Sequence, residues 1–232
     1  IGYSKDIPTS PSMFETLNLE DEISHNFYDV RDLAKLTEVV TTEKPDFIFH
    51  LAAEAIVSRS HAHPLEAISS NVMGTANILE ALRNSNHCCT AIIITSDKAY
   101  ENVEQVWGYK ENDKLGGKDM YSGSKGAAEV IINSYIKSYF NNKDCKVKIA
   151  IGRAGNVIGG GDWAADRIVV DCIRAWSEGK TVQIRSPTAT RPWQHVLEPL
   201  YGYLVLSYNL YYNPKKYSGA WNFGTETKFS VS

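Results

Sequence analysis

Three consecutive side chains that can exchange protons follow an apolar run of the sequence. The run A-I-I-I-T (91–95) leads directly to Ser96, Asp97 and Lys98, which carry a hydroxyl, a carboxylate and an amine. In an open parallel sheet, ligands bind just beyond the carboxyl ends of the strands. The three residues are therefore candidates for acid–base chemistry on a bound ligand, although a solvated ion pair at a strand end is the simpler interpretation of these residues alone.

A phenol and a second amine come next, at the start of a predicted helix. Tyr121 and Lys125 are four residues apart, so their side chains share one face of that helix. A cation beside a phenol favours the phenolate and lowers the pKa of the tyrosine, which could then act as a general acid or base near neutral pH. A tyrosine and a lysine four residues apart are also common on solvated helices. The position of this pair one loop after Ser96–Lys98 favours a catalytic role.

Strands and helices, the elements that must position these residues, alternate along the first part of the chain. Asp32 is a candidate N-cap for a helix, and residues 1–4 resemble the end of a buried strand. Such alternation implies right-handed βαβ units. The sequence therefore predicts an α/β fold, a Rossmann-like parallel sheet with helices on both faces. Strands are expected within 26–32 and at 47–53, 91–95 and 146–152, and helices behind Asp32 and at 64–84 and 121–140.

The composition of the chain changes after Gly155, where glycine, tryptophan and arginine become dense. Helices are expected at 169–178 and 196–209, and a short strand at 182–185. Residues 1–156 and 157–232 are therefore expected to form two parts, a Rossmann-like part and a smaller part that faces the substrate. Because the chain opens as if within a strand and stops where a helix could start, we expect a fragment of a longer protein.

Composition and charge exclude several classes of protein. The net charge is −3, which gives no electrostatic argument for binding nucleic acid or an anionic membrane. No apolar run approaches the roughly 20 residues that span a bilayer. The four cysteines form no C-x-x-C pair, so neither a disulfide framework nor a zinc site is indicated and a reducing cytoplasm is the expected compartment.

Several other motifs have simple interpretations. No G-x-G-x-x-G occurs in the chain, and Gly159–Gly161 is followed by Asp162-Trp163 rather than by a helix, which argues against a phosphate loop. His61 and His63 are expected to be a surface pair, His50 a core residue, and His195 a functional candidate. Three arginines of the second part could bind a pyrophosphate through their guanidinium forks; they are Arg167, Arg185 and Arg191.

Longer segments of the sequence resemble the extended short-chain dehydrogenase/reductase family and, within it, the CDP-glucose 4,6-dehydratases. Four segments carry the general likeness: H-L-A-A-E (50–54), N-V-M-G-T-A-N (71–77), T-S-D-K-A-Y-E-N (95–102) and Y-S-G-S-K (121–125). The narrower likeness rests on R-A-G-N-V-I-G-G-G-D-W-A-A-D-R (153–167) and A-T-R-P-W-Q-H-V-L-E-P-L (189–200). Related dehydratases for dTDP- and GDP-sugars usually have Asp-Glu where this chain has Asp97-Lys98.

The resemblance implies NAD as cofactor and a nucleotide sugar as substrate. It makes 1–156 an incomplete NAD-binding domain, without the first strand and glycine-rich loop, and 157–232 a partial substrate-binding domain, in a protein that forms homodimers or homotetramers. The residues that it places beside the cofactor are Asp29, Val30, Leu51, Ala52, Ala53, Tyr121 and Lys125. The candidates for substrate contact are Val57, Asn156, Arg167 and Arg191.

The activity implied is removal of water from the sugar without net oxidation. Tyr121, held by Lys125 and Ser96, takes the proton of the 4-hydroxyl while a hydride leaves C4; Lys98 takes the C5 proton and Asp97 protonates the leaving 6-hydroxyl. These roles require a low pKa for Lys98 and a high pKa for Asp97, so both side chains are expected to be buried. The alternatives are a nucleotide-sugar epimerase or reductase, a dTDP- or GDP-sugar dehydratase, and a non-enzymatic binding module built on a truncated cofactor site.

Overall fold

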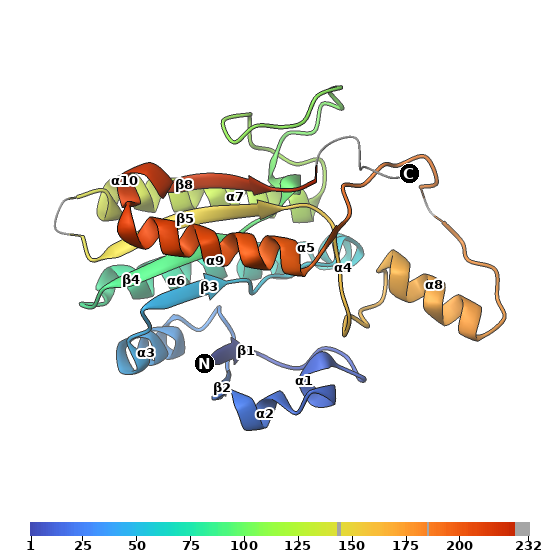
Figure 1. Ribbon diagram of the computed structural model, residues 1–232, viewed down its shortest axis with the longest axis horizontal. Helices are drawn as coiled ribbons and strands as arrows, with labels where there is room; N and C mark the ends of the chain where they lie inside the picture. Colours follow the sequence, from blue (N-terminus) through green and yellow to red (C-terminus); the bar gives the residue numbers. More distant parts are fainter. Residues whose placement is uncertain (143–144, 185, 226–232) are drawn as a thin grey trace.

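A four-stranded parallel sheet forms the centre of the molecule (Figure 1). The computed structural model describes residues 1–142, 145–184 and 186–225. The strand order is β3-β4-β5-β8 and every pairing is parallel, with Ile92 of β4 opposite Phe49 of β3 and Ala150 of β5. β4 and β5 lie inside the sheet and are almost wholly buried, as their continuous apolar sequences require.

Two further strands, β1 and β2, form a separate parallel pair. β1 pairs with β2 over three residues, and neither strand is hydrogen-bonded to the four-stranded sheet. Figure 1 shows this pair below β3, next to the short helices α1 and α2. β3 therefore has only β4 as a neighbour, which explains why Phe47 is exposed although the sequence predicts a strand buried on both faces.

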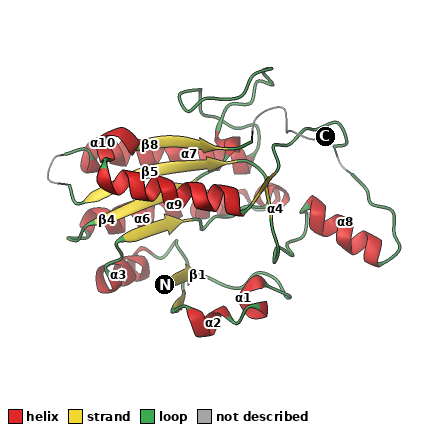
Figure 2. Cartoon of the chain, viewed as in Figure 1, coloured by secondary structure: helices red, strands yellow, loops and turns green. Residues whose placement is uncertain are grey.

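Helices cover both faces of the four-stranded sheet (Figure 2). On one face, apolar side chains of α3, α6 and α7, among them Leu79 and Ile132, pack against Ile93 and Ile151. On the other face, α9 packs its buried side chains against Ile92 and its neighbours. Successive residues of a strand point to opposite faces, so β4 supplies both halves of the core.

The bounds of the elements follow the sequence closely. The strands are β1 (Gly2–Ser4), β2 (His25–Phe27), β3 (Phe47–His50), β4 (Cys89–Ile94), β5 (Val147–Ala154), β6 (Val157–Ile158), β7 (Gln194–His195) and β8 (Gly219–Phe223). The helices are α1 (Met13–Thr16), α2 (Leu19–Glu22), α3 (Leu33–Glu43), α4 (Val57–Ala62), α5 (Pro64–Ile68), α6 (Gly74–Asn84), α7 (Met120–Tyr135), α8 (Ile168–Ser177), α9 (Leu197–Tyr212) and α10 (Pro214–Tyr217).

Most predicted elements are confirmed, with a few corrections. The helix expected at 64–84 is interrupted by a π-helical turn at Ser69–Met73, and the helix expected at 121–140 ends in another at Ile136–Phe140. The strand expected at 182–185 is wrong for residues 182–184, which are loop; Arg185 lies outside the described residues. Within the described ranges, no helix is long and apolar enough to cross a membrane.

Candidate active site

The end of β4 turns sharply, and this turn displays the first group of candidate residues. Ser96 caps a short 3-10 turn, because its Oγ accepts a hydrogen bond from the Lys98 backbone N–H (3.2 Å) and donates one to Asp97 Oδ1 (3.1 Å). Lys98 Nζ lies 3.9 Å from Asp97 Oδ1, and the two side chains are 34% and 37% exposed. The expected burial of Asp97 and Lys98 is therefore wrong: they form a half-open ion pair at the strand end.

Asp119 begins α7 and thereby sets the place of the second group. Its carboxylate accepts hydrogen bonds from the Ser122 backbone N–H (3.0 Å) and hydroxyl (2.6 Å), an N-cap of ordinary form. The first turn of α7 then carries Tyr121 to the end of β4, where it hydrogen-bonds Ser96. The two groups that the sequence analysis singled out thus lie together, as the parallel sheet predicts.

The environment of Tyr121 differs from the one expected. Burial raises the pKa of Tyr121, while the neighbouring Ser96 side chain and the positive charge of Arg167 lower it. The expectation of a lowered pKa is therefore wrong for this structure, because loss of water around the phenol outweighs the nearby charges. The positive charge that lowers the pKa of Tyr121 comes from Arg167, in the second part of the chain.

Lys125 lies beneath Tyr121 and is buried. Its Nζ donates a hydrogen bond to the Ile94 carbonyl (3.3 Å), and burial lowers its pKa to about 8. His50 lies close by, also buried, with its Nε2 3.3 Å from Thr75 Oγ1. Burial, helped by the charge of Lys125, lowers the pKa of His50 to about 3, so the prediction of a neutral core histidine is confirmed.

A buried asparagine that the sequence analysis left without a role connects the loop after β3 to α7. Asn71 accepts a hydrogen bond from the Glu54 backbone N–H (2.7 Å) and donates to the Glu54 carbonyl (3.1 Å) and to Ser124 Oγ (2.8 Å). It therefore anchors residues 51–54, which include Ala52 and Ala53, beside the helix of Tyr121. An amide inside the apolar helix 64–84 is the signal that could have identified it.

The candidates for substrate contact lie at the end of β5 and in the segments after it. A buried Oδ1 atom of Asn156 has no hydrogen-bond partner, which fits a side chain that faces a ligand. Gly155 leaves no room for a side chain, because a Cβ atom would lie 3.0 Å from Pro192 Cγ and 3.2 Å from Asp97 Oδ2. Gly155 therefore lies close to both the Asp97 carboxylate and Pro192 of the R-P-W-Q-H segment.

The remaining predicted contacts are closer to the surface. Arg167 Nε is buried without a hydrogen bond, 3.6 Å from Asp162 Oδ2. Arg191 is exposed and donates to the Thr190 carbonyl (2.7 Å), and Val57 is exposed at the first residue of α4. Arg167 is thus the arginine nearest the phenol, while Arg191 and Val57 lie in more open positions.

The residues expected around the adenine follow the ends of β2 and β3. The Asp29 carboxylate binds the Arg31 guanidinium (2.6 Å), which holds the pKa of Asp29 below its usual value. Asn77 Nδ2 donates to the carbonyls of Val30 and Arg31, both at 3.0 Å, and so fixes this turn. Leu51 is exposed just beyond β3. These residues form a turn of defined shape, open to solvent.

The site fits one half of a dinucleotide better than the other. Tyr121, Lys125 and the unpartnered Asn156 oxygen provide donors and acceptors at the carboxyl ends of β4 and β5, where a nicotinamide ribose could bind. The pyrophosphate of a dinucleotide normally rests on a glycine-rich loop and a helix N-terminus between neighbouring strands. No such motif occurs in this sequence, and β1 and β3 are not hydrogen-bonded to one another.

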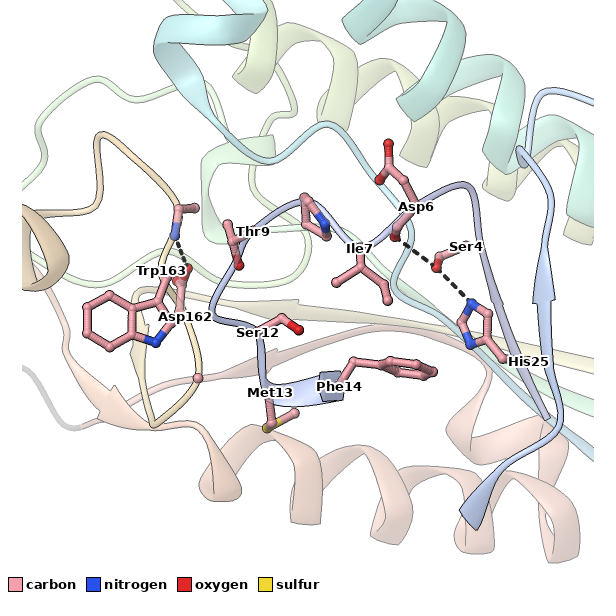
Figure 3. A pocket seen from close by; sticks show the side chains of 13 residues that line it. Ser4, Asp6, Ile7, Thr9, Ser12, Met13, Phe14, His25, Asp162 and Trp163 are labelled. Atoms are coloured by element: carbon pink, nitrogen blue, oxygen red, sulfur yellow. Dashed lines mark hydrogen bonds between the residues drawn. The ribbon is translucent and has the colours of Figure 1, made fainter. Parts of the chain in front are cut away.

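A cavity that the sequence did not predict lies apart from these residues (Figure 3). The N-terminal segment that contains Ser4 and Phe14 encloses it together with His25 and the loop that carries Asp162 and Trp163. Its volume is about 280 Å³. It contains none of the predicted catalytic residues, so the acid–base chemistry is assigned to the ends of β4 and α7 on geometry.

The other predicted motifs have structural roles or none. His61 and His63 are exposed, and in the described parts of the chain no three metal-ligating side chains come together. His195 is exposed, and its Nδ1 accepts a hydrogen bond from the Leu197 backbone N–H (3.3 Å). The structure therefore gives the functional prediction for His195 no support.

Comparisons with known proteins agree with this geometry. Over 226 residues, the chain is 46% identical to the CDP-glucose 4,6-dehydratase of Salmonella typhimurium, which covers 96% of this chain and 63% of that protein. It is 31% identical over 126 residues to the CDP-paratose 2-epimerase of Salmonella typhi, covering 48% of this chain and 37% of that protein. The chain thus spans less than two thirds of the length of these relatives.

Solved structures share the fold. A UDP-glucuronic acid 4-epimerase from Bacillus cereus, in complex with UDP-glucuronic acid and NAD, superposes with a TM-score of 0.79 at 20% identity, covering 99% of this chain and 70% of the other. A dTDP-glucose 4,6-dehydratase from Streptomyces venezuelae gives 0.78 at 18% identity, covering 94% and 62%. The family model of GDP-mannose 4,6 dehydratase matches residues 11–206. With its parallel sheet and its Tyr121–Lys125 helix at the end of β4, the chain belongs to the GDP-mannose 4,6 dehydratase family.

Proposed function

We propose that the protein containing this chain is an NAD-dependent hydro-lyase that removes water from a nucleotide-activated hexose, with CDP-glucose as substrate and a 4-keto-6-deoxy sugar as product. The observation that carries the proposal is the contact at the end of β4. There the acid–base pair Asp97–Lys98 and the Tyr121–Lys125 helix lie together. The cytidine preference is supported by the 46% identity to the Salmonella CDP-glucose 4,6-dehydratase.

We assign residues 1–156 to the cofactor and residues 157–232, of which 226–232 lie outside the described residues, to the substrate. Tyr121 and Lys125 would hold the nicotinamide ribose. Asp29 and Val30 would contact the adenine, and Leu51, Ala52 and Ala53 would line the middle of the cofactor. When bound, NAD accepts a hydride from C4 of the sugar and returns it to C6. This chain contains no glycine-rich motif of the kind that normally binds the pyrophosphate of a dinucleotide.

Tyr121 acts as the base for the 4-hydroxyl proton. Ser96 hydrogen-bonds its phenol, and the guanidinium of Arg167 stabilises the phenolate, opposing the effect of burial. Lys125 is buried below Tyr121 and donates one hydrogen bond to the Ile94 carbonyl. Its remaining N–H donors would hold the ribose and the phenolate in place relative to one another. The base is thus Tyr121 of α7, assisted by the guanidinium of Arg167 from the substrate-binding part.

Lys98 and Asp97 carry out the elimination. The 4-keto group acidifies the proton on C5. Lys98, as the neutral amine, removes this proton while Asp97, as the protonated acid, gives a proton to the departing 6-hydroxyl, so that water leaves. The proton that Tyr121 took from the 4-hydroxyl replaces, through solvent, the one that Asp97 gave. Lys98 then returns a proton to C5. In the free chain this pair is about one third exposed. A sugar bound between Asn156, Arg167 and Arg191 would cover the pair and exclude its water, which the roles require.

A second activity on the same fold, epimerisation or reduction of a nucleotide sugar, needs Tyr121 and Lys125 but gives Asp97 and Lys98 no task. The position of Asp97, whose carboxylate lies close to Gly155 at the end of β5, favours elimination. A dTDP- or GDP-sugar dehydratase is less well supported, since Lys98 stands where those enzymes have a glutamate. A binding module without activity would, like an epimerase, give the Asp97–Lys98 pair no task.

We further propose that α7 contributes to a homodimer or homotetramer in the reducing cytoplasm. Val130 and Tyr139 are exposed on the helical segment 120–140, which fits a helix that packs against a second copy. The four cysteines are unpaired, which agrees with a reducing compartment. Sedimentation of the complete gene product would distinguish a dimer or tetramer from a monomer.

The direct test uses the complete product of the gene, with catalytic NAD and either CDP-glucose or dTDP-glucose. The 4-keto-6-deoxy product is followed by its absorbance in alkali. Product from CDP-glucose alone supports the whole proposal, and product from dTDP-glucose alone keeps the chemistry but refutes the cytidine preference. Bound NAD without product from either sugar would favour the epimerase or reductase.

The role of Lys98 is tested by Lys98→Gln. Loss of the C5 base is expected to lower kcat by about 10²–10⁴, with little change in KM. Lys114→Gln is the matched control, because Lys114 is an exposed lysine of the following loop that pairs with Glu101 (2.7 Å) away from the site. An equal loss in both variants, or none in Lys98→Gln, would remove Lys98 from the mechanism.

A further inference from the structure

A buried ion pair lies directly behind the proposed catalytic residues. Glu129, in α7, and Arg153, in β5, are both buried. Arg153 Nε donates to Glu129 Oε1 (2.8 Å) and Oε2 (3.0 Å), and Arg153 Nη2 donates to the same carboxylate. Removing two charges from water costs about as much as their attraction returns, so such a pair adds little net stability. Its place beside the site therefore points to positioning.

Glu129 connects α7 to the end of β4. It lies one turn beyond Lys125, on the face that also carries Tyr121. Thr95 Oγ1 donates to Glu129 Oε1 (2.6 Å), and the preceding residue, Ile94, accepts from Lys125 Nζ (3.3 Å). Ile94 and Thr95, at the end of β4, therefore hold Lys125 and Glu129 on two successive turns of α7. These contacts fix the position of Tyr121 relative to the sheet.

Arg153 extends the same network to the acid–base segment. Its Nη1 donates to the Tyr100 hydroxyl (2.6 Å) and to the Glu111 carbonyl (3.0 Å), and the guanidinium lies 4.6 Å from the centre of the Tyr100 ring. Tyr100 directly follows the 3-10 turn Asp97–Ala99, and its hydroxyl donates to Asn222 Oδ1 (2.7 Å) in β8. One guanidinium thus joins α7 to the residue that ends the turn of Asp97 and Lys98.

We propose that Glu129 and Arg153, acting through Tyr100, are positioning residues that hold the Asp97–Lys98 turn in a fixed place relative to Tyr121. The inference rests on the proposed function, since dehydration requires both groups to act in turn on one sugar ring. The network touches neither sugar nor cofactor. Its loss should therefore slow the elimination, which depends on the position of the turn, more than the oxidation at C4.

Tyr100→Phe tests the link, with Tyr109→Phe as its matched control. The two rings stack with centroids 5.1 Å apart, but the Tyr109 hydroxyl contacts only the loop, at Asn102 and the Val103 N–H. The complete gene product is assayed with CDP-glucose deuterated at C4 or at C5. In Tyr100→Phe, kcat should fall about tenfold, the loss of one buried hydrogen bond. The C5 isotope effect on kcat should rise and the C4 effect should fall towards one.

Tyr109→Phe should leave both isotope effects at their wild-type values. Arg153→Lys keeps the buried charge but loses the fork that reaches Glu129 and Tyr100 together, so it should change the isotope effects in the same direction as Tyr100→Phe. A merely structural defect would lower the amount of active enzyme without changing either isotope effect. Unchanged isotope effects in Tyr100→Phe would therefore overturn the proposal.

A readout without substrate keeps the inference separate from the proposed function. If the unaltered protein forms no product from either sugar nucleotide, the proposed function fails while the network is still measurable. Amide hydrogen exchange should then be faster over Lys98–Tyr100 in Tyr100→Phe than in Tyr109→Phe. Equal exchange in the two variants would overturn the positioning role.

Discussion

Lys125 must carry a positive charge in surroundings that disfavour one. Burial lowers its pKa to about 8, and only the carboxylate of Glu129 works against this effect. A lysine is charged below its pKa, so the ammonium that we propose holds the Tyr121 phenolate is lost as the pH rises through about 8. We expect kcat/KM to fall over the same range, a measurement that reports groups of the free enzyme.

Lys125→Arg provides the control for this pH dependence. A guanidinium keeps its charge throughout the accessible pH range, so any activity of the variant should persist above pH 8. If kcat/KM of Lys125→Arg still falls above pH 8, the fall is caused by the ionisation of another group.

His50 should make the fold sensitive to acid. Its pKa is about 3 in the folded chain because burial excludes the charged form, against an ordinary 6.5. As the pH falls below 6.5, the unfolded chain binds a proton that the folded chain does not, so stability decreases down to about pH 3. This difference is worth up to about 4–5 kcal/mol. Urea unfolding at pH 7 and pH 4.5 should show a smaller difference in His50→Gln than in the unaltered chain.

Local spacing was sufficient to select candidate catalytic residues that lie together in the fold, but their surroundings were not predictable. Tyr121 and Lys125 were found from their i,i+4 spacing, and Ser96–Lys98 from the end of an apolar run. The pKa direction of Tyr121 depends on burial by distant segments and on Arg167, which no local pattern reports. Glu129 and Arg153 were missed for the same reason, since they are 24 residues apart and meet only in the folded core.

Among the helices, α9 packs most closely against the sheet through a glycine. A Cβ atom at Gly202 would lie 2.4 Å from Phe223 Cε1 of β8, so Gly202→Ala must displace either α9 or that ring. We expect Gly202→Ala to lower the free energy of unfolding by about 1–3 kcal/mol, as measured in urea.

Gly123, inside α7, has nothing within 4 Å of the place its Cβ would take and serves as the control. Gly123→Ala should raise the free energy of unfolding by about 0.5–1 kcal/mol, because alanine loses less backbone entropy in a helix. Equal effects of the two substitutions would mean that α9 can move freely on the sheet.

The strand that the sequence analysis missed and the strand that it predicted wrongly both have a weak apolar pattern. β8, G-A-W-N-F, was missed because a short run with a glycine and an asparagine does not stand out; it forms because Ala150–Ala154 offers it a parallel neighbour. The strand expected at 182–184 finds no such partner and remains loop. Pairing across the sheet, rather than local propensity, decided both cases.

For the molecule as a whole, the separation of β1–β2 from the four-stranded sheet should appear as unequal protection. The small pair is held by three residues on each strand, whereas β4 is enclosed between two neighbours and two helix layers. Amide exchange of this chain should therefore be markedly faster at residues 2–27 than at 89–94. Equal protection would show that both sheets open as one unit. The parallel pairing of β3, β4 and β5 followed from the βαβ pattern, but the separation of β1 and β2 did not, because both groups of strands give the same local signal.

The short ladder between β6 and β7 has a consequence for how this protein could change over evolutionary time. Val157 pairs with Gln194 and Ile158 with His195. The long segment between β6 and β7 therefore starts and ends at the same place in the fold. α8, within that segment, stands apart from the sheet in Figure 1. A segment closed in this way can change in length or sequence while β5 and β8 keep their register, so the proposed substrate contacts Arg167 and Arg191 could change while Tyr121 and the Asp97–Lys98 turn stay in place.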